Sequence, residues 1–97
     1  MMEEAEYMAL VDALEAASGK LSRLGAGIIA ALALDIASDS RSFSRILGIA
    51  HALVLREVVV LSAEGGYIRI RQRDERTQRT RYELSATGNR LVEEIRL

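Results

Sequence analysis

The sequence contains no cysteine, no proline and no tryptophan, and it has a single histidine. Without cysteine, the chain can form neither a disulfide framework nor a thiolate metal site, which fits a reducing cytoplasm. The lone histidine has no other ligand at a suitable spacing, so we expect no metal and no cofactor. No apolar run reaches the roughly 20 residues of a membrane span, and the start "MMEEAEY" lacks the basic region of a signal peptide. We therefore expect a cytoplasmic protein without a membrane segment.

Features of an enzyme are also missing. The sequence shows no nucleophile paired with a base, no glycine-rich phosphate loop and no cluster of metal ligands. The carboxylate pairs Glu3/Glu4 and Glu93/Glu94 are near the chain ends, where they would be poorly fixed for acid and base catalysis. We therefore expect a binding protein rather than an enzyme.

Charge is unevenly distributed along the chain, although the net charge is only -1. Residues 1–19 carry acidic side chains and no basic partner before Lys20, whereas residues 66–82 carry six arginines against Asp74 and Glu75. A near-neutral total argues against a nucleic-acid binder when taken alone. A binding surface depends on local potential, however, so a basic patch can coexist with a neutral sum.

The pattern of apolar residues predicts one domain over residues 1–97, mainly α with a β-hairpin. Leu24, Ile28, Leu32 and Ile36 recur at helical spacing and indicate a buried central helix. Ser38, Asp39 or Ser40 can cap a short third helix that Gly48 would close. The expected parts are a first helix (1–19), a three-helix core (22–66), a hairpin (67–84) and a last helix (85–97).

The stretch "VLREVVVL" is ambiguous, because its β-branched residues suit a strand paired with "YIRIR". A helix fits better, since Ile49, Val54, Val58 and Leu61 fall close to one helical face. Gly65 and Gly66 would then stop this helix.

The hairpin is expected to hold "YIRIRQR" and "RTRYEL" around the loop "DERTQ", with Ile68 and Ile70 alternating with Arg69 and Arg71. Arginines on neighbouring strands would crowd like charges, which costs stability when two oppose each other directly. Phosphate is the natural complement of such a cluster. The alternative is a solvated strand face on which Glu83 and Asp74 are the local partners.

The predicted order of elements is that of a winged helix-turn-helix, and the chain from Ser40 to Leu91 resembles the MarR family of bacterial and archaeal transcription regulators. The resemblance is carried by "FSRILGIAHALVLREVVVLSAEGGYI" and by "RDERTQRTRYELSATG", with an Asp-x-Arg at Asp74–Arg76 and a Leu-Ser-x-x-Gly at Leu84–Gly88. It implies a short member of the family, a regulator that acts, in the commoner mode, as a repressor. It further implies a homodimer on a pseudo-palindromic operator of double-stranded DNA, with a small-molecule effector left open.

Candidate DNA contacts follow from the expected elements and from this resemblance. Arg56 is the best base reader, because arginine can pair with guanine in the major groove. His51 can contact a base or a phosphate, or be a plain surface residue. By resemblance, Arg76 would enter the minor groove and Asp74 would hold the wing arginine in place. The full set of expected contacts is Arg41, Ser42, Ser44, Ala50, His51, Ala52, Leu55, Arg56, Arg71, Arg73, Arg76, Thr77 and Arg79.

Two further expectations concern protein contacts. The stripe Tyr7, Met8, Val11 and Leu14 can be one face of the monomer core, but we favour a dimer contact, because a first helix outside a three-helix core has little else to pack on. Leu91 and Ile95 are expected to join this interface. The alternative function is an interaction module, because Leu53, Leu55 and Val59 cannot all be buried and could dock on another protein.

Overall fold

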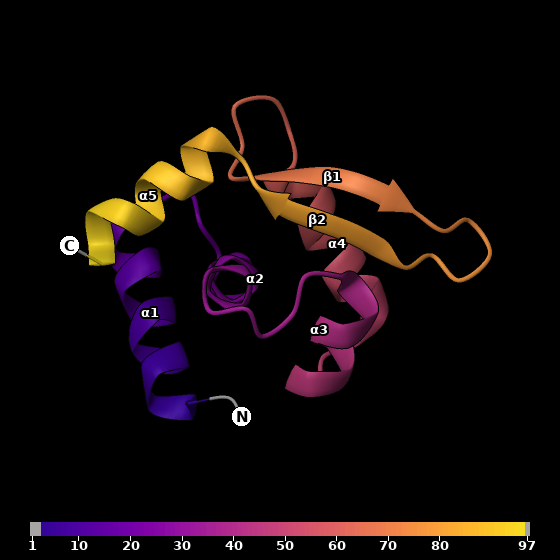
Figure 1. The fold of residues 1–97 in the computed structure, drawn as a ribbon, viewed down its shortest axis with the longest axis horizontal. Coiled ribbons are helices and arrows are strands. Elements are labelled where there is room, and N and C mark those ends of the chain that lie inside the picture. Colours follow the sequence, from indigo (N-terminus) through magenta and orange to yellow (C-terminus); the bar gives the residue numbers. More distant parts are fainter. Residues whose placement is uncertain (1–2, 97) are drawn as a thin grey trace.

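The computed structural model describes residues 3–96 as an α+β domain whose arrangement is consistent with a winged helix (Figure 1). The hairpin extends away from the helices, which gather around one core. The structure confirms that the ambiguous stretch after Ile49 is a helix. The elements are α1 (Glu4–Ala17), α2 (Arg23–Ala33), α3 (Ser40–Leu47), α4 (His51–Leu61), β1 (Ile68–Arg73), β2 (Thr80–Leu84) and α5 (Ala86–Arg96).

Helix α2 forms the centre of the domain, as its composition predicts. Every residue from Gly25 to Ala31 is buried, which requires neighbours on all sides of the helix. Figure 1 shows α2 end-on, with α1 and α5 on one side and α3, α4 and the hairpin on the other. Ser22 caps α2 by accepting a hydrogen bond from the backbone N–H of Gly25. None of the helices described has both the length and the apolar character needed to cross a membrane.

Helix α1 belongs to the monomer core, which corrects the dimer interface expected from the sequence. Tyr7, Val11 and Leu14 are buried against α2 and therefore cannot contact a second copy. For these three residues the expectation was wrong. It assumed that α1 had no surface of its own domain to pack on, whereas the side of α2 that faces α1 is also apolar. Met8 alone in the stripe is exposed, at 38%. Leu91 and Ile95 are half-buried against the same core, where α5 packs on α1.

Helix α3 and the turn after it form as the sequence indicates. Asp39 is the N-cap residue, and its carboxylate accepts hydrogen bonds from the N–H and the hydroxyl of Ser42. Gly48 ends α3 with φ +68°, a left-handed conformation that glycine adopts without strain. The hydroxyl of Ser44 donates to the carbonyl of Ile49, so this side chain holds the turn into α4.

The hairpin contains a β-bulge at Arg71, which the sequence did not indicate. Ile70 is opposite Tyr82, but the next paired residues are Gln72 and Arg81. On β1 the alternation of buried and exposed residues ends at Ile70, before the bulge, whereas on β2 Thr80 and Tyr82 are buried on either side of the exposed Arg81. Ile68 is buried and Ile70 is 37% exposed, because the hairpin extends beyond the helices there.

The start of α5 is fastened to the root of the hairpin. The hydroxyl of Ser85 donates to the carbonyl of Gly66 and accepts from the N–H of Gly88, so Ser85 caps α5. Gly88 lies directly against the backbone carbonyl of Tyr67, with no space for a side chain. The Leu-Ser-x-x-Gly segment is thus a tight joint between the hairpin and the last helix.

Candidate nucleic-acid interface

The loop of the hairpin, the start of α3 and the start of α4 come together on one side of the domain. The guanidinium of Arg41, on α3, donates to the carbonyl of Thr77 in the hairpin loop, with its Nη2 at 2.6 Å. His51, the first residue of α4, contacts Ser40, the first residue of α3. Arg41, Thr77 and His51 were all expected to contact DNA, and the structure brings them together. The Arg41 side chain and the Thr77 carbonyl already form the hydrogen bond that holds the hairpin, here called the wing, against α3.

Asp74 organises the backbone of the hairpin loop. Its Oδ1 accepts hydrogen bonds from the N–H groups of Arg76, at 2.9 Å, and Thr77, at 3.3 Å. Gln78 adopts a positive φ of 63°, and its side chain closes the turn by donating to the carbonyl of Glu75. Asp74 thus fixes the backbone that carries Arg76, and the Arg76 side chain stays exposed.

Ser40 connects three elements at the buried base of this site. Its Oγ accepts a hydrogen bond from the N–H of Thr80 on β2 and is 2.8 Å from Nε2 of His51 on α4. Ser40 and Thr80 are fully buried. The sequence indicated Ser40 only as one of three possible caps, because nothing in the local pattern shows which distant strand a serine will meet.

The pKa of His51 is lowered by its surroundings. Burial disfavours the charged imidazolium, and the guanidinium groups of Arg41 and Arg79 act in the same direction, against the opposing effect of Asp39. The neutral ring can accept a hydrogen bond at Nε2 from the hydroxyl of Ser40, which meanwhile accepts from Thr80. His51 therefore links α4 to α3 through Ser40 and is not only a surface residue.

We expect this histidine to make the domain less stable in mild acid. Its folded pKa lies below the ordinary value of 6.5, so the unfolded chain takes up the proton first and stability falls as the pH drops below about 6.5. The measurement is urea unfolding between about pH 8 and about pH 5, where most carboxylates stay ionised. The variant His51→Gln should lose less stability over this interval. Identical pH profiles for the variant and the native chain would contradict the assignment.

The six hairpin arginines divide into neutralised and free groups. Glu83 forms ion pairs with Arg69, directly opposite on β1, and with Arg71, and Asp39 lies 3.7 Å from Nε of Arg79. Among residues 3–96, no carboxylate oxygen lies within 4 Å of the guanidinium nitrogens of the other three arginines. The free arginines are Arg73, Arg76 and Arg81.

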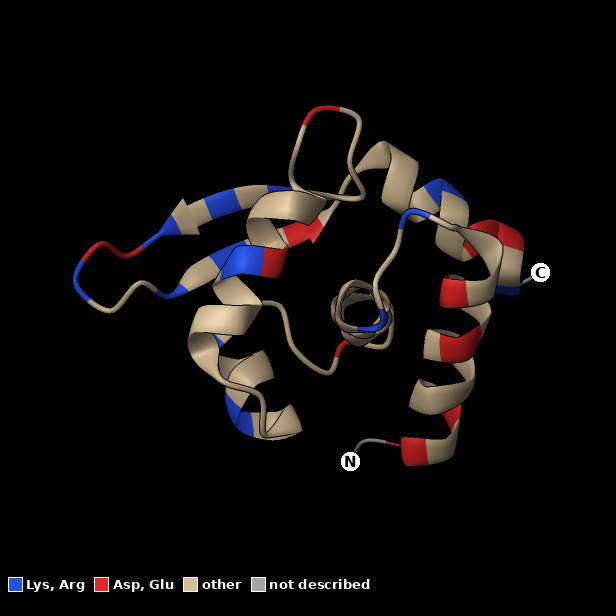
Figure 2. Cartoon of the chain, turned by 180° about the vertical axis from the view of Figure 1, so that it is seen from behind, with Lys and Arg blue, Asp and Glu red and all other residues tan. Residues whose placement is uncertain are grey.

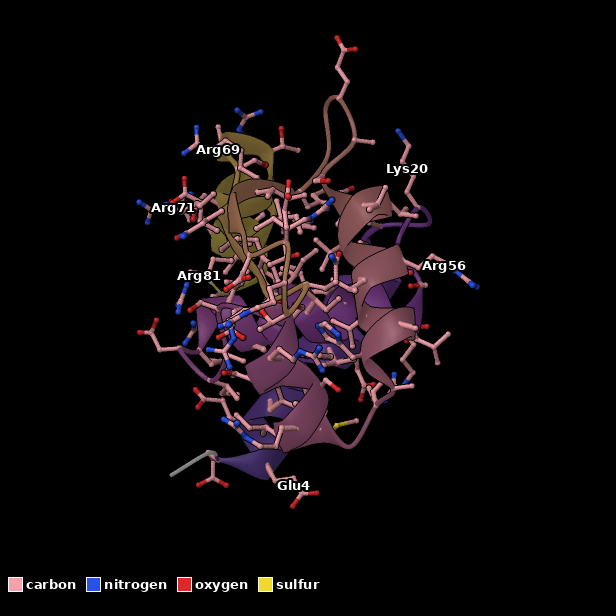
Figure 3. All side chains as sticks on the ribbon, turned by 90° about the vertical axis from the view of Figure 1, so that its right-hand side faces the viewer. Glu4, Lys20, Arg56, Arg69, Arg71 and Arg81 are labelled. Atoms are coloured by element: carbon pink, nitrogen blue, oxygen red, sulfur yellow. The ribbon has the colours of Figure 1, made fainter. Side chains whose placement is uncertain are left out.

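The strand register avoids the directly opposed arginine pairs that the sequence made possible. Arg69 opposes Glu83, Arg73 opposes Thr80, and Arg81 opposes Gln72, so no two arginines are directly paired. Of the expected DNA contacts, Arg71 and Arg79 are partly neutralised, while Arg81 is free although it was not among them. Figure 3 shows Arg69, Arg71 and Arg81 on one side of the domain and Arg56 on the opposite side.

Helix α4 presents an unusual surface for a helix expected to read bases. Its N-cap residue is Ala50, whose methyl group leaves the first-turn N–H groups without a side-chain cap. Ala52 and Arg56 are exposed and Leu55 is half-buried. Leu53 and Val59 are also exposed, at 47% and 55%, which confirms that they are not part of the core. Between Leu53 and Val59 the helix carries two charged side chains, the exposed Arg56 and the half-buried Glu57.

Two depressions could admit other ligands. A groove of about 1070 Å³ runs between the hairpin, α3 and the segment after α2, with Arg45, Arg71 and Arg81 among its lining residues. An apolar pocket of about 330 Å³ lies between α1, α2 and α3, lined in part by Met8 and Phe43. In the described part of the chain, no three potential metal-binding side chains gather in one place. A small-molecule effector stays a prediction.

Comparisons with protein-family models, with curated proteins and with solved structures find no match to this chain. The resemblance to MarR regulators therefore stays a prediction, carried by the residues quoted above.

Proposed function

We propose that the chain is a winged helix-turn-helix protein that binds double-stranded DNA and regulates transcription in the cytoplasm. The observation that carries this proposal is the position of the wing loop. It is fastened to α3 by Arg41, stands beside the uncapped start of α4, and carries exposed arginines that no carboxylate of residues 3–96 neutralises. Guanidinium groups of this kind bind phosphate oxygens and release condensed counterions.

The proposed DNA contacts are of two kinds: phosphate contacts that position the domain, and base contacts that recognise sequence. Arg73 and Arg76 in the wing, together with the free N–H groups at the start of α4, would bind phosphate and set the orientation of the domain. Arg56 is the side chain that could pair with a guanine edge. Because the rest of the outward face is apolar, we expect sequence discrimination to be modest and to depend on thymine methyl groups and DNA shape. Repression of a pseudo-palindromic operator by two copies stays a prediction.

The test is duplex binding measured by fluorescence anisotropy across a salt series. We expect Arg76→Ala to weaken binding and to reduce the dependence of log affinity on log salt by about one, the signature of one lost phosphate contact. Arg90→Ala is the matched control, because it removes the same charge from an exposed position on α5, away from the wing. Equal effects of the two variants, or no binding at low salt, would overturn the proposal.

A second candidate function is binding to another protein, favoured by the exposed apolar residues of α4. Leu53, Val59 and Val60 together place more apolar surface on this helix than contact with a groove requires. The two charged residues of the same helix, Arg56 and Glu57, indicate what kind of protein would bind there.

A further inference from the structure

One stripe of α4 combines two apolar and two oppositely charged residues. Leu53, Arg56, Glu57 and Val60 are three, four and seven positions apart, so they follow one side of the helix. Leu53 and Val60 are 47% and 58% exposed. Val59 is equally exposed but lies about a quarter turn away from Val60 around the helix.

The two charges of the stripe have no ion-pair partner within residues 3–96. Arg56 points away from the domain on the side opposite Arg69, Arg71 and Arg81 (Figure 3). The half-buried Glu57 side chain lies beside the first turn of α2, with Oε2 2.9 Å from where a Cβ on Gly25 would lie. Seen from behind, α4 shows one adjoining basic and acidic segment on an otherwise uncharged helix (Figure 2).

The stripe on one copy of the chain is complementary to the same stripe on a second copy running in the opposite direction. If two α4 helices pack antiparallel about a twofold axis at their middle, Arg56 of each copy faces Glu57 of the other. The same register places Leu53 of each copy against Val60 of the other. A twofold interface needs this reciprocity, in which each residue meets its counterpart twice.

We propose that two copies of the chain pair through this stripe of α4, antiparallel about a twofold axis. The helix spans only about 16 Å, so the contact is smaller than the roughly 800 Å² per partner of a stable interface. The association is therefore weak and depends on concentration. It also covers the face of α4 that the duplex would meet, so pairing and DNA binding compete. This last consequence rests on the proposed function, whereas the pairing itself does not.

Charge reversal tests the register in the absence of DNA. Sedimentation of the full chain over a range of concentrations should show a monomer–dimer equilibrium. Arg56→Glu and Glu57→Arg should each weaken it at least about tenfold, because each places like charges together. The double variant carrying both substitutions should restore the native dissociation constant within about threefold, since every opposed pair is again of opposite sign. Failure of the double variant to recover would overturn the register.

A second pair of variants distinguishes this stripe from general stickiness. Val60→Glu should abolish pairing, and Val59→Glu should leave it unchanged, although the two valines are adjacent and equally exposed. Circular dichroism should show that both variants keep the native fold. A chain that is monomeric at all concentrations, or equal loss in the two variants, would overturn the proposal. Arg76→Ala should leave pairing intact, so failure of DNA binding and failure of pairing are separate results.

Discussion

Replacement of Gly88 by alanine is expected to destabilise the domain by about 2 kcal/mol or more. Alanine favours a helix over glycine by about 1 kcal/mol, which alone would stabilise α5. In this position, however, a Cβ would overlap the backbone carbonyl of Tyr67 at the root of the hairpin. Backbone cannot move aside as a flexible side chain can, and overpacking of this kind costs about 3 kcal/mol. Steric exclusion therefore outweighs helix propensity.

Thermal unfolding followed by circular dichroism measures this effect. For a domain of this size, a loss of about 2 kcal/mol lowers Tm by roughly 8–16 °C. Gly19→Ala is the control, because no atom beyond those of its chain neighbours lies within 4 Å of its hypothetical Cβ. That variant should unfold within a few degrees of the native chain. A Gly88→Ala variant as stable as the control would show that α5 does not approach Tyr67 as closely as described.

Replacement of Ser40 by alanine is expected to cost about 2 kcal/mol and to loosen the wing. The substitution keeps the Cβ but leaves the buried N–H of Thr80 without an acceptor and removes the partner of His51. An unsatisfied buried donor costs about 1–3 kcal/mol. The loss is specific to the junction of α3, α4 and β2, so the hairpin should separate from the helices more often.

Hydrogen exchange of the Thr80 amide reports this loosening directly, since its protection should fall by more than that of α2 amides. Ser62→Ala serves as the control, because the Ser62 hydroxyl only donates to the carbonyl of Val59 at the exposed end of α4. This control should change stability by a few tenths of a kcal/mol. Unchanged Thr80 protection in Ser40→Ala would mean that another group accepts this hydrogen bond.

The helices were predictable because their signals are local. The cap at Asp39 and the stop at Gly48 are separated by one short helix, and the face formed by Val54, Val58 and Leu61 is buried as the spacing predicts. The role of α1 was not predictable in the same way. A stripe such as Tyr7, Val11 and Leu14 shows that a helix has an apolar side, but not whether its own domain or a second copy covers it.

The candidate site was predictable in composition but not in its contacts. The wing arginines and Asp74 stand where the sequence placed them, in and beside one loop. Which arginines are neutralised depends on the bulge at Arg71 and on the register that sets Arg69 against Glu83. Pairing across strands is a long-range property, as is the meeting of Ser40 with Thr80, so no local pattern encodes either.

The separation of charge gives the domain an electric dipole along its length. Figure 2 shows acidic segments along α1 and basic segments along the hairpin, at opposite ends of the longest dimension of 40 Å. A net charge of -1 means that a distant polyanion exerts almost no net force on the molecule. Under the proposed function, the field of that polyanion would still exert a torque that turns the wing toward it before contact. The domain would thus turn its wing toward the polyanion before it is attracted to it. Added salt would screen this torque and slow the association of the two molecules.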